Sequence, residues 1–315
     1  MNGPNVETST GKVGILLTAL GGPGSLEEVG PFLLEVRGGR PTSPALVAEF
    51  RERYAQIGGK SPLLEISGAQ ARALEVRLNQ GRARYRCRVG MRHWKPFIRD
   101  VLADMQREGL AHVVVLPLTP FHSRRTVGMY FRAVEEAQAP SGSSLDLAYV
   151  ESWNTQPALI SALSHRTMEG LGRLAAAGFP DPLVIFTAHS LPRQLIESGD
   201  DYEKELRETF ELVVEHTGRP RSQLAFQSAG RSEEPWLGPP LEATLTECAN
   251  AGEKAVLLVP FGFISDHLET LYDLDIEAKG FAGKLGLRFE RADSLNTDPM
   301  LIEAMAHAVQ ERLSA

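Results

Sequence analysis

Carboxylates recur at every fourth residue in one segment near the end of the chain, at Glu269, Asp273 and Glu277. In an α-helix this spacing places the three side chains on one face, where like charges repel one another. Stability does not explain such a row, whereas a row of hard oxygen ligands suits the binding or transfer of a divalent cation. The segment therefore indicates metal chemistry, with a solvated charged helix face as the alternative.

A histidine, His189, lies just beyond the apolar run 183–186 in the same half of the chain. An imidazole at a strand tip can bind a metal or accept a proton near neutral pH. A hydrogen-bonded structural histidine is the commoner case for a single residue of this kind. Its combination with the acidic segment favours a functional role.

The acidic segment also has structural explanations. Asp266 as N-cap and Glu269 at the third helical position would form a capping box, which accounts for only one of the three carboxylates. The opposing side of the helix is predicted to carry an apolar stripe, formed by Leu268, Leu271, Tyr272 and Ile276. The acidic side would then face either water or a cleft.

Short apolar runs bounded by glycine and proline predict the strands that position these residues. They alternate with stretches of helical period, which is typical of βαβ units and parallel sheets. Strands are predicted at 13–17, 113–116, 183–186 and 255–259, and helices at about 69–78, 94–108, 157–176, 201–215, 239–251 and 298–313.

Three segments of the first half are echoed in the second half in the same order. The pairs are 14–23 with 183–192, 85–92 with 226–231, and 114–121 with 257–264. This repetition predicts an α/β fold of two flavodoxin-like domains, each a doubly wound parallel sheet, related by an internal repeat.

The repeat also predicts the domain boundaries. We expect a disordered N-terminal tail over residues 1–12, a first α/β domain over 13–122 and a second over 123–293. The junction includes the loop-like stretch 139–144. The C-terminal helix, within 294–315, is expected to pack back on the first domain.

Ligands of such sheets bind at the carboxyl ends of the strands. The residues that follow the predicted strands are Leu20, Gly21, Gly22, His93, Trp94, His122, Ser123, His189, Ser190, Gln227, Ser228, Phe261, Phe263 and Asp266. If the two domains face each other, these residues line one cleft. The arginines 37, 40, 51 and 53 lie near its edge and suit a ligand that carries carboxylates.

The composition excludes several classes of protein. The 315 residues carry a formal net charge of -7, which argues against a nucleic-acid-binding protein. No apolar run reaches the roughly 18 residues of a membrane span, and the start has no secretory signal, so a cytoplasmic location is expected. Cys87 and Cys248 are predicted to be packing residues, and two thiols are too few for an iron–sulfur centre. The sequence has neither a dinucleotide fingerprint nor a P-loop.

The chain resembles the ferrochelatase family, which inserts ferrous iron into a porphyrin, from about Val13 to the final helix. The resemblance is carried by 187–192, by 265–275, and by 227–228 with 235–239. It implies a porphyrin cleft between the domains and assigns the iron-site chemistry jointly to His189 and Glu269, the expected catalytic pair. Metal ligands are expected at His189, Glu269, Asp273 and Glu277, and porphyrin contacts at Leu20, Arg37, Arg40, Tyr54, His93, Ser123, Trp236 and Phe263.

Within this family, segments 36–40, 53–63 and 91–97 look most like the coproporphyrin-using enzymes. Those enzymes typically carry a tyrosine where this chain has Leu20, which is more like the protoporphyrin enzymes. The expected function is iron insertion in haem biosynthesis, with coproporphyrin III favoured over protoporphyrin IX. Fe²⁺ is then a substrate, with no permanently bound cofactor and, since a C-terminal cysteine extension is missing, no iron–sulfur cluster.

Two alternative functions stay open at this point. One is a cobalt or nickel chelatase acting on a sirohydrochlorin-like ring, and the other is a porphyrin or haem carrier without turnover. For the ferrochelatase, the expected partners are the porphyrin and ferrous iron, with no nucleic acid and no transmembrane segment. Transient contact with a membrane or a haem acceptor stays open. A serine hydrolase built on His189 and Ser190 is disfavoured, because neighbouring residues of an extended chain point to opposite sides.

Overall fold

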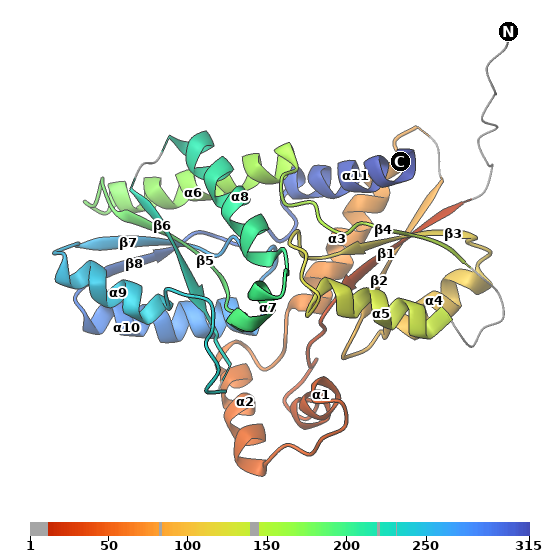
Figure 1. Ribbon diagram of the computed structural model, residues 1–315, viewed down its shortest axis with the longest axis horizontal. Coiled ribbons are helices and arrows are strands. Elements are labelled where there is room, and N and C mark those ends of the chain that lie inside the picture. Colours follow the sequence, from red (N-terminus) through yellow and green to blue (C-terminus); the bar gives the residue numbers. More distant parts are fainter. Residues whose placement is uncertain (1–11, 82–83, 139–144, 219–220, 231) are drawn as a thin grey trace, which may run out of the picture.

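Two four-stranded parallel sheets form the centre of the molecule (Figure 1). The computed structural model describes residues 12–81, 84–138, 145–218, 221–230 and 232–315. The first sheet has the order β2-β1-β3-β4 and the second the order β6-β5-β7-β8, so both halves share one strand order. The predicted fold class, with two doubly wound parallel sheets, is confirmed.

The strands are β1 (Val13–Ala19), β2 (Tyr85–Met91), β3 (His112–Pro117), β4 (Asp146–Tyr149), β5 (Leu183–His189), β6 (Ser222–Gln227), β7 (Ala255–Val259) and β8 (Arg288–Arg291). The helices are α1 (Val29–Val36), α2 (Pro44–Gln56), α3 (Leu63–Leu78), α4 (Ile98–Arg107), α5 (Val127–Gln138), α6 (Pro157–Ala176), α7 (Arg193–Glu197), α8 (Tyr202–Thr217), α9 (Leu241–Asn250), η1 (Glu269–Ala278), α10 (Lys279–Lys284) and α11 (Pro299–Ser314).

The four strands predicted from apolar runs are the four inner strands of the two sheets: β1, β3, β5 and β7. Helices cover both faces of an inner strand, which therefore reads as a continuous apolar run; every residue of β1 and β7 is buried. The edge strands lack such a run. In β2, Arg86 and Arg88 alternate with apolar residues and pair with Glu75 and Glu108 at the sheet edge.

Sheet membership differs from the predicted division at residues 122 and 123. Strand β4 lies beside β3 in the first sheet, with Val113 opposite Leu147. Residues up to Tyr149 therefore contribute to the first sheet. The predicted tail lies outside the described residues apart from Lys12, as does the stretch 139–144.

Helix α11 returns from the second sheet toward the first (Figure 1). On α3, Arg77 Nη2 donates to Glu303 Oε1 of α11 at 2.6 Å. At the start of α6, Gln156 Nε2 donates to Glu311 Oε2 at 2.6 Å. The final helix therefore contacts helices of both sheets.

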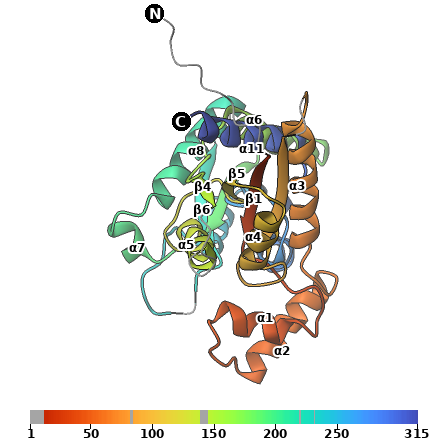
Figure 2. The ribbon, with the colours of Figure 1, turned by 90° about the vertical axis from the view of Figure 1, so that its right-hand side faces the viewer.

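Helices α1 and α2 form an arm that projects beyond the sheets on the side of the strand ends (Figures 1 and 2). The arm has its own small core of Val29, Leu33 and Tyr54. Leu268, the residue just before η1, packs against this core. The arm is therefore attached to the acidic helix of the second half.

No helix in the described parts of the chain combines the length and the apolar character that crossing a bilayer requires.

Candidate active site

His189 and Glu269 meet at the carboxyl end of the second sheet. His189 ends β5, an inner strand, and Glu269 begins η1. The Nδ1 atom of His189 lies 2.9 Å from Oε2 of Glu269, and the two side chains are 33% and 29% exposed. The pair is therefore hydrogen-bonded within the protein and still accessible to a ligand.

The strand end that carries His189 is held by Tyr202 of α8. The Tyr202 hydroxyl donates to the His189 carbonyl oxygen at 3.0 Å. The ring of Tyr202 packs edge-on against Phe121, with the ring centroids 6.4 Å apart. The ring contact holds Tyr202 in place, and its hydrogen bond holds the backbone from which the imidazole projects.

The acidic segment forms a π-helix, η1, where the sequence analysis expected an α-helix. Its i→i+5 bonding makes each turn wider than that of an α-helix, and such helices are frequent at functional sites. Because a turn then takes more than four residues, carboxylates four positions apart still share one side. Side-chain contacts to other elements hold residues 269, 273 and 275, and a local sequence pattern does not encode them.

Ser228 connects the first two carboxylates of the row. Its hydroxyl donates to Oδ2 of Asp273 at 2.6 Å, and Ser228 also lowers the pKa of Glu269. Ser228 has φ of 55°, a left-handed conformation that non-glycine residues seldom adopt and that is common at functional sites. Its position after β6 therefore orients Asp273 and places a hydroxyl near Glu269.

The outer part of the row contacts Arg53 from α2. Nη1 of Arg53 lies 3.5 Å from Asp273 Oδ1, and Nη2 lies 3.8 Å from Glu277 Oε1. A continuous line of contacts thus runs from His189 through Glu269 and Asp273 to Glu277. Among the described residues, however, no three histidine, cysteine or acidic side chains gather closely enough to hold a metal ion.

The electrostatics make His189 and Glu269 an ion pair. Burial alone raises the pKa of Glu269, but the charge and hydrogen bond of His189 lower it to about 2. For His189, burial lowers the pKa, but the charge and hydrogen bond of Glu269 raise it by more. The pKa of His189 therefore lies above its usual value. For Asp273, burial and the nearby Glu269 charge raise the pKa to about 6.

The ion pair predicts a pH window of stabilisation. The raised pKa of His189 gives stability that is present below its ordinary value of 6.5 and is lost at higher pH. The lowered pKa of Glu269 gives stability that is present above 4.5 and is lost as pH falls toward 2. We expect His189→Gln to lower the free energy of unfolding more at about pH 5.5 than at about pH 9. Urea unfolding at both pH values measures this, and an equal loss at both would contradict it.

Several predicted porphyrin contacts are exposed or partly exposed. Leu20 follows β1, is 41% exposed, and accepts a backbone hydrogen bond from His93 at 2.9 Å. Burial lowers the pKa of His93 to about 4, so its ring is neutral at pH 7. Arg37 and Arg40 follow α1 and are exposed, and Arg40 Nε donates to the Arg37 carbonyl. Phe263 lies against the ring of His267 with centroids 4.5 Å apart.

Other predicted contacts are buried. Tyr54 lies in the core of the arm, and burial together with the Glu269 charge raises its pKa. Ser123 is fully buried and donates to Oδ2 of Asp200 at 3.2 Å, so its hydroxyl is already used within the protein. The indole nitrogen of Trp236 is buried and has no hydrogen-bond partner among the described residues.

Comparison with known proteins shows the family of the chain. A model of the family described as Ferrochelatase matches residues 12–313. The chain belongs to the ferrochelatase family. The expected resemblance is therefore confirmed, and with it the expectation of a metal-inserting enzyme.

Curated relatives match nearly the whole length of this ferrochelatase-family chain. It is 37% identical to the ferrochelatase of Deinococcus radiodurans over 307 residues, covering 97% of each protein. It is 38% identical to that of Geotalea uraniireducens, covering 96% of this chain and 99% of the relative. For the ferrochelatase of Thermus thermophilus the identity is also 38%, covering 94% and 98%.

Solved chelatase structures share the fold of this ferrochelatase-family chain. SirB from Bacillus subtilis with Fe³⁺ superposes with a TM-score of 0.60 at 14% identity, covering 96% of this chain and 95% of SirB. The chelatase-like protein DR2241 from Deinococcus radiodurans gives a TM-score of 0.53 at 14% identity, covering 94% of this chain and 54% of its own. At these identities the likeness shows the two-domain fold alone.

The strand-end residues of this ferrochelatase-family chain do not all face a ligand. Phe261 is fully buried and packs edge-on against Phe121 and Phe186 in the core. Ser190 and Gln227 are also buried, and their side chains bond to Leu237 and Thr187. The predicted cleft lining is therefore too broad, because several side chains at the strand ends point back into the core.

The capping box predicted at the start of the acidic helix is wrong. The Asp266 carboxylate accepts from Ser294 at 2.7 Å and from Asn296 at 2.8 Å, so it does not cap η1. The predicted apolar stripe is also wrong. The buried side of η1 carries Thr270, Leu274 and Ala278, whereas Ile276 is 37% exposed.

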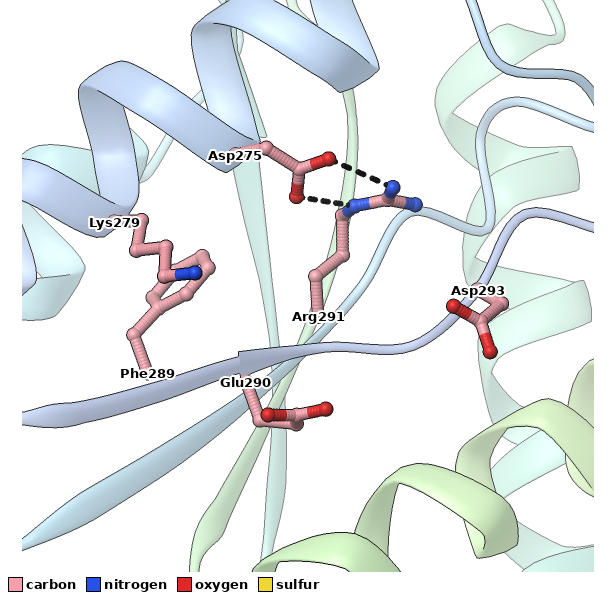
Figure 3. A pocket seen from close by; sticks show the side chains of 6 residues that line it. All are labelled: Asp275, Lys279, Phe289, Glu290, Arg291 and Asp293. Carbon is pink, nitrogen blue, oxygen red and sulfur yellow. Dashed lines mark hydrogen bonds and ion pairs between the residues drawn. The ribbon is translucent and has the colours of Figure 1, made fainter.

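An arginine that the sequence analysis did not single out anchors η1 on another side (Figure 3). Arg291 of β8 donates to both carboxylate oxygens of Asp275, at 2.6 and 2.8 Å, and lies 3.5 Å from Asp266. Its side chain is 12% exposed. The pair borders a polar hollow of about 350 Å³, lined by Asp275, Lys279, Phe289, Glu290, Arg291 and Asp293.

Removing this anchor is expected to destabilise the protein. Arg291→Met leaves Asp275 and Asp266 without their cation, and we expect a loss of about 2 to 3 kcal/mol in the free energy of unfolding. Arg207→Met is the control, because it breaks an exposed pair with Glu203 in one helix and should lose about 0.5 kcal/mol or less. Urea unfolding measures both variants. Equal losses would show that the Arg291 anchor contributes no more than a surface pair.

Proposed function

We propose that the protein inserts ferrous iron into coproporphyrin III, with His189 and Glu269 as the catalytic pair. The observation that supports this most is their hydrogen bond at the end of β5, at the head of a row of carboxylates. Both side chains are partly exposed at the edge where parallel sheets bind ligands. In this proposal Fe²⁺ and the porphyrin are substrates, and the protein needs no resident cofactor.

The reaction requires removal of both pyrrole protons and delivery of an iron ion that has shed its water. His189 and Glu269 share these tasks, since an imidazole and a carboxylate can each accept a proton or bind the metal. In the free protein the imidazole is paired with Glu269, whose charge raises the pKa of His189 and so favours its protonated form. An approaching dication repels the imidazolium, which favours loss of its proton and makes the nitrogen available.

Asp273 and Glu277 extend the path away from the pair. With its pKa near 6, Asp273 has both a charged and a neutral form accessible close to neutral pH. A group of this kind can carry protons outward and can also bind a cation in transit. We infer that the row conducts iron inward and protons outward along one side of η1.

The choice of porphyrin rests on the arginines beside the first sheet. Arg37 and Arg40 are exposed after α1, where their guanidinium groups suit propionate side chains. Coproporphyrin III carries more propionates than protoporphyrin IX, so the arginines favour coproporphyrin. Leu20 offers an apolar contact to the ring, and its likeness to the protoporphyrin enzymes counts against this choice.

Turnover of Fe²⁺ with each porphyrin tests the proposal. We expect a higher kcat/KM with coproporphyrin III than with protoporphyrin IX. The double variant Arg37→Gln/Arg40→Gln should lower kcat/KM for coproporphyrin III by about tenfold or more and change that for protoporphyrin IX less. Preference for protoporphyrin IX in the wild type would reject the porphyrin assignment while retaining iron insertion.

A cobalt or nickel chelatase is the competing enzyme, because the fold is shared with a sirohydrochlorin chelatase bound to cobalt, at a TM-score of 0.53 and 11% identity. Assays with Co²⁺ and Ni²⁺ against a sirohydrochlorin-type ring separate the two. Faster metallation of that ring than of either porphyrin would reject the proposed function.

A further inference from the structure

We propose that Arg53 is a resident cation on the acidic row, which an incoming divalent metal ion must displace before it reaches Glu269. This inference rests on the proposed function, in which Asp273 and Glu277 conduct the metal ion. We call these two residues the outer carboxylates. Arg53 belongs to α2, so the displaced group comes from the arm and not from η1 itself.

The guanidinium of Arg53 lies among three carboxylates. Its Nη2 atom is 3.1 Å from Glu49 Oε1, and its distances to the outer carboxylates are 3.5 and 3.8 Å. The ring of Tyr272 on η1 lies beneath it, 4.9 Å from the centroid. The single positive charge of Arg53 is therefore smaller than the negative charge that the three carboxylates around it can carry.

The contacts to the outer carboxylates are loose. Arg291, which anchors the other side of η1, makes a bidentate pair with Asp275 at 2.6 and 2.8 Å. The contact of Arg53 with Asp273 is longer, at 3.5 Å. A divalent ion draws carboxylate oxygens to about 2.0 to 2.6 Å and carries twice the charge. Exchange of the guanidinium for such an ion is therefore favourable.

Glu49 gives the displaced guanidinium a second position. It lies one helical turn before Arg53 on α2, and its carboxylate makes the shortest of the three contacts. Arg53 can thus leave the row while it keeps an ion pair within its own helix. Because Arg53 and Leu268 both join the arm to η1, arrival of the metal ion would also remove one of these attachments.

Metal binding without porphyrin tests this role. Mn²⁺ is the probe, and the free ion is followed by electron paramagnetic resonance as it is titrated with wild type, Arg53→Gln and Arg51→Gln. We expect Arg53→Gln to lower the Kd for Mn²⁺ by about fivefold or more, because the resident cation is gone. Arg51→Gln removes the same charge from the same helix, where Arg51 Nε donates to the Leu26 carbonyl at 3.1 Å, and should change the Kd by less than about twofold.

A second variant guards against misfolding of Arg53→Gln. Tyr272→Leu removes the ring beneath the guanidinium without changing any charge, and we expect a smaller gain in Mn²⁺ affinity, about twofold. Unchanged or weaker binding in both variants would overturn the proposal, as would an equal gain in Arg51→Gln. Since the titration contains no porphyrin, its failure is separate from a failure of the wild type to metallate porphyrin, which would instead reject the proposed function.

Discussion

Glu269→Gln is expected to lower the turnover of iron insertion by about 100- to 1,000-fold. The amide keeps the size of the side chain but neither carries a charge nor accepts a proton at neutral pH. Its partner His189 would lose the carboxylate that raises its pKa, and the row would lose its innermost negative charge. Anaerobic steady-state assays with Fe²⁺ measure the turnover, and fluorescence titration measures porphyrin binding, which should change little.

The control for this variant is Glu136→Gln. Glu136 is an exposed carboxylate on α5 that pairs with Arg132 one turn earlier, remote in sequence from η1. Its replacement removes the same charge and should leave turnover unchanged. Insertion at the wild-type rate in Glu269→Gln would refute the catalytic role of Glu269.

His189→Ala is expected to bind porphyrin and to lower turnover by about 100- to 10,000-fold. In the wild type the imidazole must lose its proton before it can accept another, and its pKa lies above 6.5. We therefore expect wild-type turnover to rise with pH across the range from about 6 to about 9. The residual turnover of His189→Ala should lose this dependence. A profile in the variant that keeps the wild-type slope would assign the titrating group elsewhere.

His165→Ala serves as the matched control. His165 lies on α6 with an exposed side chain and a salt-bridge contact to Glu169 at 3.8 Å. This histidine does not belong to the strand-end site, and its loss should alter neither turnover nor the pH profile. A comparable effect in both variants would point to a general loss of structure.

The sheets could be predicted because their inner strands are buried on both faces. Continuous apolar runs marked β1, β3, β5 and β7, and the order of the echoes matched the shared strand order. The edge strands escaped prediction because their polar residues pair across the sheet edge, as Arg86 does with Glu75. Helix α2 of the arm was not predicted for a related reason. Only its Tyr54 is buried, so the helix shows little apolar periodicity.

The candidate site could be predicted where a local pattern marks a residue, such as the end of an apolar strand or the regular spacing of acids on a helix. His189 and Glu269 meet as the strand-end rule and the acidic spacing suggested. The contacts that tune them were not predictable. Arg53 meets Asp273 across 220 positions of sequence, and Ser228 depends on a left-handed turn after β6. Such contacts follow from the packing of distant elements and leave no local pattern.

The common strand order of the two sheets gives Leu20 and His189 equivalent places. Leu20 follows β1 and His189 ends β5, and each of these strands lies second in its sheet. Leu20 comes two residues after the fully buried Thr18, and His189 two residues after the fully buried Thr187. One position is aliphatic and the other is a base. A planar ligand bound between these two strand ends would have an aliphatic side chain against one face and a base against the other. Its metal would then approach only from the face that the base contacts.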